Sequence, residues 1–281
     1  MNGYCRLSHV KADITGLSGI TTIDAELARG IEEESRIIDA YVRRFFYSRL
    51  ATRYFERRPN TCRERLRLVG ETGQAVDVIS ISALTIDDDE DYDYDSYTLT
   101  ENTHYWLTDR WSPNEGPYAA LELIPGNTTL STWPMQRRGI KVVCLEGFSQ
   151  DTEAGGTTAE ALDASETGVD MTAGHGTEIG DTLIIDSEQM DVNAVSTDTL
   201  TVTRGINGTV AATHLTGATV LRRRFPKDIE RACKDAVVRR RWNVQSGFTG
   251  QAMEDPLANR GSQFLYEWRR LLNSYRLPVV P

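Results

Sequence analysis

The sequence predicts an α+β protein, with a helical core, β-strand excursions and an inserted small all-β module. Three observations favour this fold class. Apolar residues recur at helical spacing near both ends of the chain, β-branched runs lie between residues 75 and 148, and an acidic Gly/Thr-rich segment follows those runs. With 281 residues, of which 40% are apolar, the chain can form one large domain or two small ones.

The N-terminal region predicts two helices. Residues 22–47 place Leu27 and Ile31 at helical spacing, with acidic residues early and arginines late, as the helix dipole favours. A shorter helix precedes it, for which Ser8 is the expected cap and Gly16 the expected stop.

Three β-branched runs predict strands at Ala75–Ile86, Tyr118–Ile124 and Gly139–Phe148. Between the first two lies an acidic run, Asp87–Asp95, whose alternating Asp residues invite a calcium-loop interpretation. An EF-hand loop needs Gly at its sixth position and Glu at its twelfth, and neither stands there in any of three registers. We therefore expect a solvated acidic hairpin tip.

The segment after Ser149 predicts a separate β module. Short turns join candidate strands at Asp181–Ser187, Met190–Ser196 and Thr199–Arg204, as in a meander, and Gly217–Arg224 is the expected last strand. Linker-like composition at both edges indicates that this module is inserted into the rest of the chain.

The helical period returns at Pro226, which suits a first helical turn. A final helix over residues 262–276 carries an aromatic and aliphatic stripe with two arginines beside it. This stripe either packs onto its own subunit or docks into a groove on a partner, and we expect docking with Trp268 and Tyr275 as anchors. The candidate docking residues are Phe264, Trp268, Arg269, Arg270, Leu272 and Tyr275.

The run "VTRGINGTVAATH", Val202–His214, can be interpreted either as a phosphate-binding loop or as a β-turn. A phosphate-binding P-loop needs a Lys after its second Gly, and none follows here. Asn207 and Gly208 both tolerate positive φ, so the run predicts a tight turn.

A hydrolase would need Asp186, Ser187 or Glu188 to converge with His175 or His214. No G-x-S-x-G elbow supports this, and in a strand Ser187 would face away from its two acidic neighbours. The four dispersed cysteines indicate buried apolar residues rather than a disulfide framework or a zinc site. We expect no catalytic, cofactor or metal site.

Charge is distributed in blocks, although the net charge is -10. Residues 36–67 hold ten arginines against three acidic residues, and residues 222–281 hold thirteen basic against six acidic residues. Residues 150–221 hold twelve acidic residues and one arginine. The Arg-rich blocks leave open an alternative function, a DNA-binding module. No run approaches the ~18 apolar residues of a membrane helix, and no signal peptide is recognisable, so we expect assembly in the cytoplasm of the cell that makes the protein.

Several segments together resemble a known family. "YCRLSHVKADI", "IEEESRIIDAYVRRFFY", "TRYFERR", "ISALTIDDD", "PYAALELIP", "IKVVCLEGF", "FPKDIERACKDAVVRRRW" and "LLNSYRLP" resemble, in order, the head–tail adaptor (connector) proteins of long-tailed bacteriophages. The acidic "IGDTLIIDSEQMDVNAVSTDTLTVTRGINGT" resembles a small β module of phage structural proteins. The shortest adaptors lack such an insert.

The resemblance implies a non-enzymatic virion protein without cofactors, in a ring, usually dodecameric, at the neck beneath the portal vertex. Its partners would be the portal protein and the next neck or tail-completion protein. DNA would pass through the channel without sequence-specific binding, and no membrane is involved. The implied domains are residues 1–149 (adaptor core), 150–222 (inserted acidic module) and 223–281 (core helix and terminal docking helix).

Overall fold

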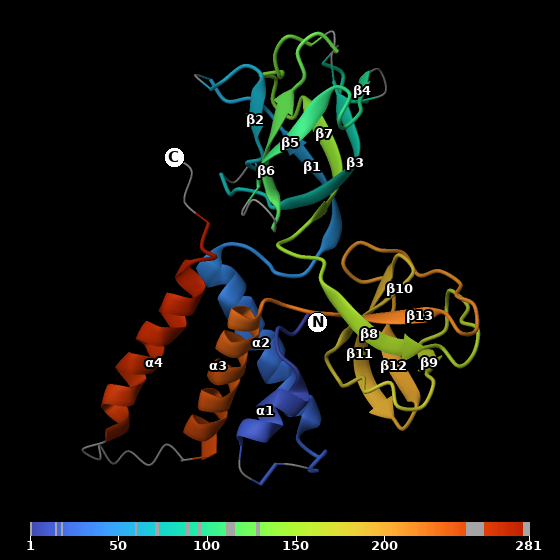
Figure 1. Cartoon of the computed structure of the whole chain (residues 1–281), viewed down its shortest axis with the longest axis vertical. Helices are drawn as coiled ribbons and strands as arrows, with labels where there is room; N and C mark the ends of the chain where they lie inside the picture. Colours follow the sequence, from blue (N-terminus) through green and yellow to red (C-terminus); the bar gives the residue numbers. More distant parts are fainter. Residues whose placement is uncertain are drawn as a thin grey trace. The chain divides into compact units, whose positions relative to one another are not determined.

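A computed structural model provides the coordinates of the chain (Figure 1). The structure describes all residues except 1, 15, 18, 60, 71, 72, 88, 89, 95, 96, 111–115, 128, 129, 246–255 and 278–281, together with the side chains of 110, 242–245 and 256–264.

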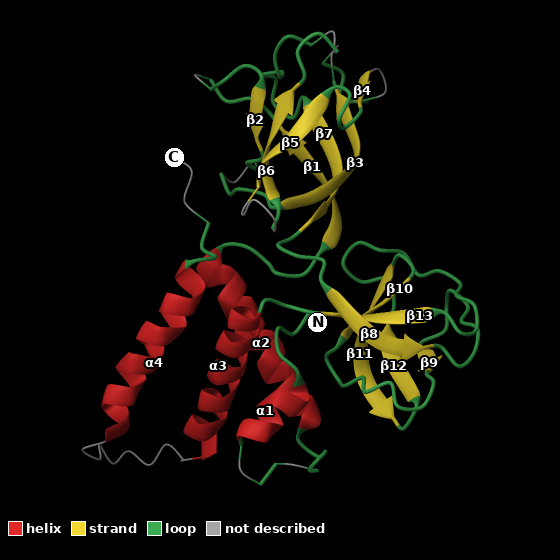
Figure 2. Cartoon of the chain, in the orientation of Figure 1, coloured by secondary structure: helices red, strands yellow, loops and turns green. Residues whose placement is uncertain are grey.

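The described chain is mostly β, with thirteen strands in two antiparallel sheets and four helices (Figure 2). The predicted helical core with β excursions is therefore wrong. The reason is that the apolar residues between residues 49 and 146 bury one another across a sheet of their own, instead of covering helices. The chain divides into a first unit, Met1–Val42 with Asp151–Arg276, and a second unit, Arg43–Gln150 with Leu277–Pro281.

The second unit is a seven-stranded sheet with the strand order β1-β7-β3-β6-β2, in which β4 pairs with β3 and β5 with β6. β3 and β4 pair antiparallel on either side of the acidic run, of which residues 88, 89 and 95 lie outside the described part. The strands are β1 (Arg49–Phe55), β2 (Arg65–Arg67), β3 (Val78–Ile86), β4 (Tyr97–Leu99), β5 (Tyr105–Arg110), β6 (Tyr118–Leu123) and β7 (Ile140–Glu146).

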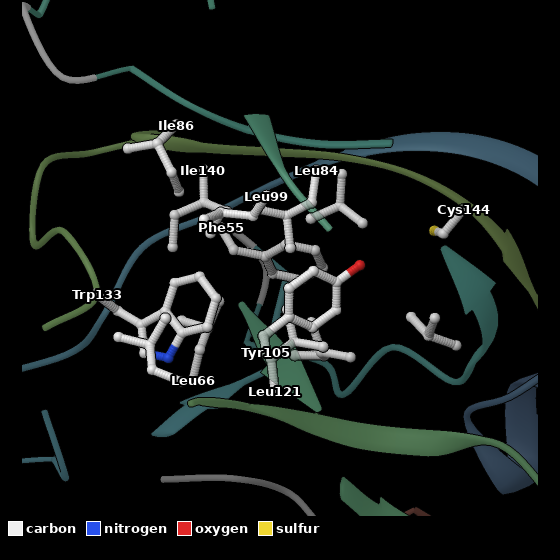
Figure 3. Close-up of a cluster of buried hydrophobic side chains, with 14 residues drawn as sticks. Phe55, Leu66, Leu84, Ile86, Leu99, Tyr105, Leu121, Trp133, Ile140 and Cys144 are labelled. Atoms are coloured by element: carbon white, nitrogen blue, oxygen red, sulfur yellow. The ribbon is translucent and has the colours of Figure 1, made fainter. Parts of the chain in front are cut away.

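One hydrophobic cluster holds this sheet together (Figure 3). β7 lies between β1 and β3, and alternate residues of β7, from Ile140 to Cys144, are completely buried. Trp133 is also completely buried, and its Nε1 donates a hydrogen bond of 2.8 Å to the Glu64 carbonyl. An aromatic ring of this size stabilises a core when its polar atom is satisfied in this way.

Four helices form the helical part of the first unit, where the blue N-terminal helices lie beside the orange and red C-terminal ones (Figure 1). α3 contacts the other three helices, and Ile31 and Ile38 of α2 are buried. α1 begins earlier than expected, so Ser8 is inside the helix, where its N–H donates to Glu178 Oε2 at 2.8 Å. The helices are α1 (Leu7–Asp13), α2 (Asp24–Val42), α3 (Lys227–Gln245) and α4 (Pro256–Asn273).

The acidic module also belongs to the first unit and forms a six-stranded sheet, in the order β8-β13-β10-β11-β12-β9. The predicted β10–β11–β12 meander is confirmed. Its core, which includes Leu183, Met190 and Leu200, is separate from that of the second unit. The strands are β8 (Thr152–Thr157), β9 (Gly168–Asp170), β10 (Thr182–Ile185), β11 (Glu188–Ser196), β12 (Thr199–Thr203) and β13 (Thr219–Arg223).

Among the described residues, no helix has the length and the apolar character that crossing a membrane requires.

Candidate functional site

α4 presents two faces with different chemistry. On one face, Leu272 is completely buried and the Trp268 ring packs on Tyr41 of α2, with ring centroids 5.2 Å apart. The Tyr41 hydroxyl donates to Asn273 Oδ1 at 2.7 Å, and Arg276 lies over the same Tyr41 ring. Contacts within the subunit therefore occupy this face.

The other face of α4 is exposed. Tyr266 is 68% exposed, and Arg270 lies one turn further along the same side, with Arg269 beside it. Leu265 is 47% exposed at the edge of this face, since it stands two turns before Leu272. Neither arginine forms an ion pair with another described residue. Tyrosine and arginine are residue types that are enriched among the residues that contribute most of the affinity of protein interfaces.

The six docking candidates are thus divided between the two faces. Arg269 and Arg270 lie on the exposed face, Trp268 and Leu272 on the packed one, and the side chain of Phe264 lies outside the described residues. Tyr275 is partly buried in the turn after the helix. Leu265 and Tyr266 were missed because the helical pattern alone does not say which face is covered.

A second cluster surrounds Glu188, which is completely buried at the start of β11. Arg204 forms a two-point ion pair with its carboxylate, at 2.6 and 2.7 Å. Backbone N–H groups of Gly205 and Ala212 also donate to it, and His214 Nε2 lies 3.0 Å from Oε2. Burial alone would raise the pKa of Glu188, but these hydrogen bonds hold it at about 2. The carboxylate is therefore ionised at neutral pH and cannot serve there as a proton donor.

The structure brings together some of the acid–base candidates. His214 Nδ1 lies 2.8 Å from Asp186 Oδ2, so carboxylates engage both of its ring nitrogens. Ser187 is exposed and has no described hydrogen bond to His214, and the hydrogen bonds of His175 go to Thr177 and Thr197 instead. Both ring nitrogens of His214 therefore face carboxylates rather than a nucleophilic side chain. The arrangement is suited to fixing the loop at residues 204–214.

That loop contains the predicted turn. Asn207 and Gly208 have φ values of 55° and 77°, and the Thr209 N–H donates to the Ile206 carbonyl at 3.1 Å. This is the geometry of a two-residue turn in which both central residues have positive φ. The Asn207 side chain bonds Asn2, which precedes α1, so the turn ties the module to the helical part of the first unit.

The Arg-rich block at residues 36–67 is divided by internal ion pairs. Arg44 pairs with Asp77 in the interior, while Arg49 and Arg53 both bond the completely buried Glu146. These arginines stabilise the second unit and do not form an open basic face. Arg36 lies in α2 and pairs with Asp39, and Arg43 follows that helix. The other arginines of the block, Arg57, Arg58, Arg63, Arg65 and Arg67, lie in β2 or in the connection between β1 and β2.

Among the described residues, no group of three or more His, Cys, Asp and Glu side chains is arranged to hold a metal ion. The chain matches no protein-family model, and comparisons with curated proteins and with solved structures find no similar protein.

Proposed function

We propose that this chain is a structural subunit of the head–tail adaptor ring of a long-tailed bacteriophage, located at the virion neck. In this role it extends the DNA channel below the portal and supports tail attachment. The resemblance of the segments outside residues 150–222 supports the proposal. So does the insert's separate sheet, because a module with its own core can be added without rebuilding the rest.

The observation that carries the proposal is the exposed face of α4. Tyr266, with Leu265 at the edge of the same face, exposes apolar surface beside Arg269 and Arg270, while the side that carries Trp268 and Leu272 is already packed. A helix with one face packed in its own subunit can offer the other to a groove on a partner. We assign this face to the portal protein.

Charge supports self-assembly into a ring. Residues 150–221 carry twelve acidic residues against one basic residue, and residues 222–281 carry an excess of basic ones. In a ring, one surface of each subunit meets a different surface of the next, so blocks of opposite charge can face each other between copies. The exposed Leu50 and Trp106 of the second unit offer further apolar surface for such contacts.

Co-sedimentation with the cognate portal protein tests the assignment of α4. Leu265→Ala with Tyr266→Ala should weaken binding about tenfold or more, because large side chains at the centre of an interface contribute most of its affinity. The matched control is Val210→Ala with Leu215→Ala, which removes exposed apolar side chains elsewhere in the same unit. Portal binding that survives the α4 substitutions unchanged would refute the assignment.

The alternative function is DNA binding in which all the arginines of each Arg-rich block contact phosphates. It is less well supported than the adaptor role. Arg44, Arg49 and Arg53 are held by acidic partners within the fold. A phosphate contact would have to displace those partners, and the buried carboxylates would be left unpaired. Filter binding of duplex DNA over a salt series measures this alternative, for which a steep slope is the signature.

A further inference from the structure

The second unit contains a cleft of about 450 Å³ beside the connection between β1 and β2. Among the described residues, five arginines line it, against one acidic residue, Glu56. Its size lies within the range of small-molecule sites. The arginines are Arg57, Arg58, Arg65, Arg67 and Arg138.

The individual contacts leave donor groups available in this cleft. Arg57 donates from Nε to the Trp133 carbonyl at 3.1 Å, which fixes its position without neutralising its charge. Arg65 pairs with Asp109, but its Nε is buried and has no acceptor among the described residues. Arg67 is exposed and forms no ion pair with another described residue. The Arg67 guanidinium therefore keeps donors that an anion in the cleft would accept.

Of the two aromatic residues that line the described part of the cleft, Phe55 is buried in the hydrophobic cluster and Tyr54 is already covered. Arg138 lies over the Tyr54 ring at 4.1 Å, and the Tyr94 ring packs against Tyr54 with centroids 5.5 Å apart. A nucleic-acid base would have to displace these contacts to stack on Tyr54. The guanidinium groups, which match phosphate oxygens two at a time, are the groups of the cleft suited to recognise an anion.

We propose that this cleft binds closely spaced phosphate groups, independently of base identity. A concentration of positive charge in so small a volume fits a ligand with several negative charges close together. Consecutive phosphates have that spacing, whether in the phosphodiester backbone of a single strand or in the polyphosphate of a nucleotide. The inference does not rest on the proposed adaptor role, because every lining residue belongs to the second unit.

Cys62 provides a reporter inside the cleft. It lines the cleft and is exposed, whereas Cys5, Cys144 and Cys233 are buried. Cys62 was expected to be buried like the others, and it is exposed because it lies in the loop between two short strands. Alkylation of the native full-length protein, followed by mass spectrometry, therefore measures access to this cleft.

The probes are a fluorescent 15-nucleotide oligothymidylate, ATP without divalent cations, and a Glu-rich peptide of similar charge. Binding of the oligonucleotide or of ATP should slow Cys62 alkylation several-fold, compared with the rate in a KCl solution of the same ionic strength. The double substitution Arg67→Gln, Arg138→Gln should lower the affinity for the ligand that protects Cys62 at least about tenfold. The reason is that a charge-assisted hydrogen bond contributes a free energy of that order. The matched control is Arg63→Gln with Arg137→Gln, which changes the same charge at neighbouring exposed positions outside the cleft.

Each outcome decides the proposal. Protection by the oligonucleotide alone identifies the phosphodiester backbone, and protection by ATP identifies nucleotides. If both double variants lower the affinity for the ligand equally, general charge attraction explains the binding and the proposal is overturned. Equally tight binding of the Glu-rich peptide also overturns it. So does a result in which no probe protects Cys62. If the Arg67→Gln, Arg138→Gln protein melts early, Arg67→Gln alone supplies the same comparison, because its exposed side chain contributes little to the core.

Discussion

Replacing Glu188 with Gln should selectively loosen the acidic module. The substitution keeps the size of the side chain but removes its charge and turns one acceptor oxygen into a donor. Arg204, whose side chain is only 6% exposed, then loses its counter-ion, and the Gly205 and Ala212 N–H groups compete for the one remaining acceptor.

The size of the effect follows from this geometry. Removing one partner of a buried ion pair costs about 3–5 kcal/mol, because the other charge stays buried. The hydrogen-bond donors around the side chain of residue 188 then compete for one acceptor oxygen, which adds to the loss of stability. Small shifts of the loop at residues 204–214 offset part of this loss. We therefore expect the free energy of opening of the module to fall by about 3–4 kcal/mol.

Native-state hydrogen exchange of the full chain measures this quantity. The His214 and Leu162 N–H groups each donate to the other residue's carbonyl at 2.9 Å, so both amides report on the loop. Glu160→Gln is the control, an exposed change of the same type in the same module, which should leave the exchange of both amides nearly unchanged. If exchange of the two amides is no faster in the Glu188 variant than in the control, the reasoning fails.

Three further predictions concern acidity, the last helix and the turn. Because the pKa of Glu188 is about 2 in the fold against 4.5 when exposed, its stabilising contribution is complete above pH 4.5 and lost as the pH falls toward 2. Exchange of module amides should then reveal a loss of about 3 kcal/mol, since one pKa unit corresponds to about 1.4 kcal/mol. Trp268→Ala should lower the thermal midpoint, at a cost of about 2 kcal/mol, because Trp268 packs on Tyr41. An unchanged midpoint with lost portal binding would restore Trp268 as an anchor. Gly208→Val should destabilise the turn by about 1–3 kcal/mol, since φ is 77° there, and unchanged exchange at Thr209 would argue against this strain.

Local sequence patterns predicted the elements whose signals are local. The helices α2 and α3, which the apolar spacing predicted, lie close to their expected positions. So do the strands of the meander, β10, β11 and β12. Asn207 and Gly208 adopt the positive φ values that their residue types favour. In these places a few neighbouring residues determine the conformation.

Long-range pairing determined the rest. β1 was not predicted as a strand, because Arg49 and Arg53 give it a polar pattern whose partner, Glu146, is more than ninety residues away. β8 has a Gly/Thr-rich sequence typical of a linker, and it becomes a strand only through pairing with β13. The contacts of Glu188 and His214 likewise depend on how the loop folds back. Sequence spacing contains no information on such convergence, so the second unit was mistaken for an excursion from a helical core.

Electron microscopy of the purified protein mixed with its portal tests the central claim most directly. The account predicts closed rings that seat on the portal and continue its channel, with the exposed face of α4 at the contact. Well-folded protein that stays monomeric and leaves the portal bare, at concentrations where thermal melting is cooperative, would contradict it.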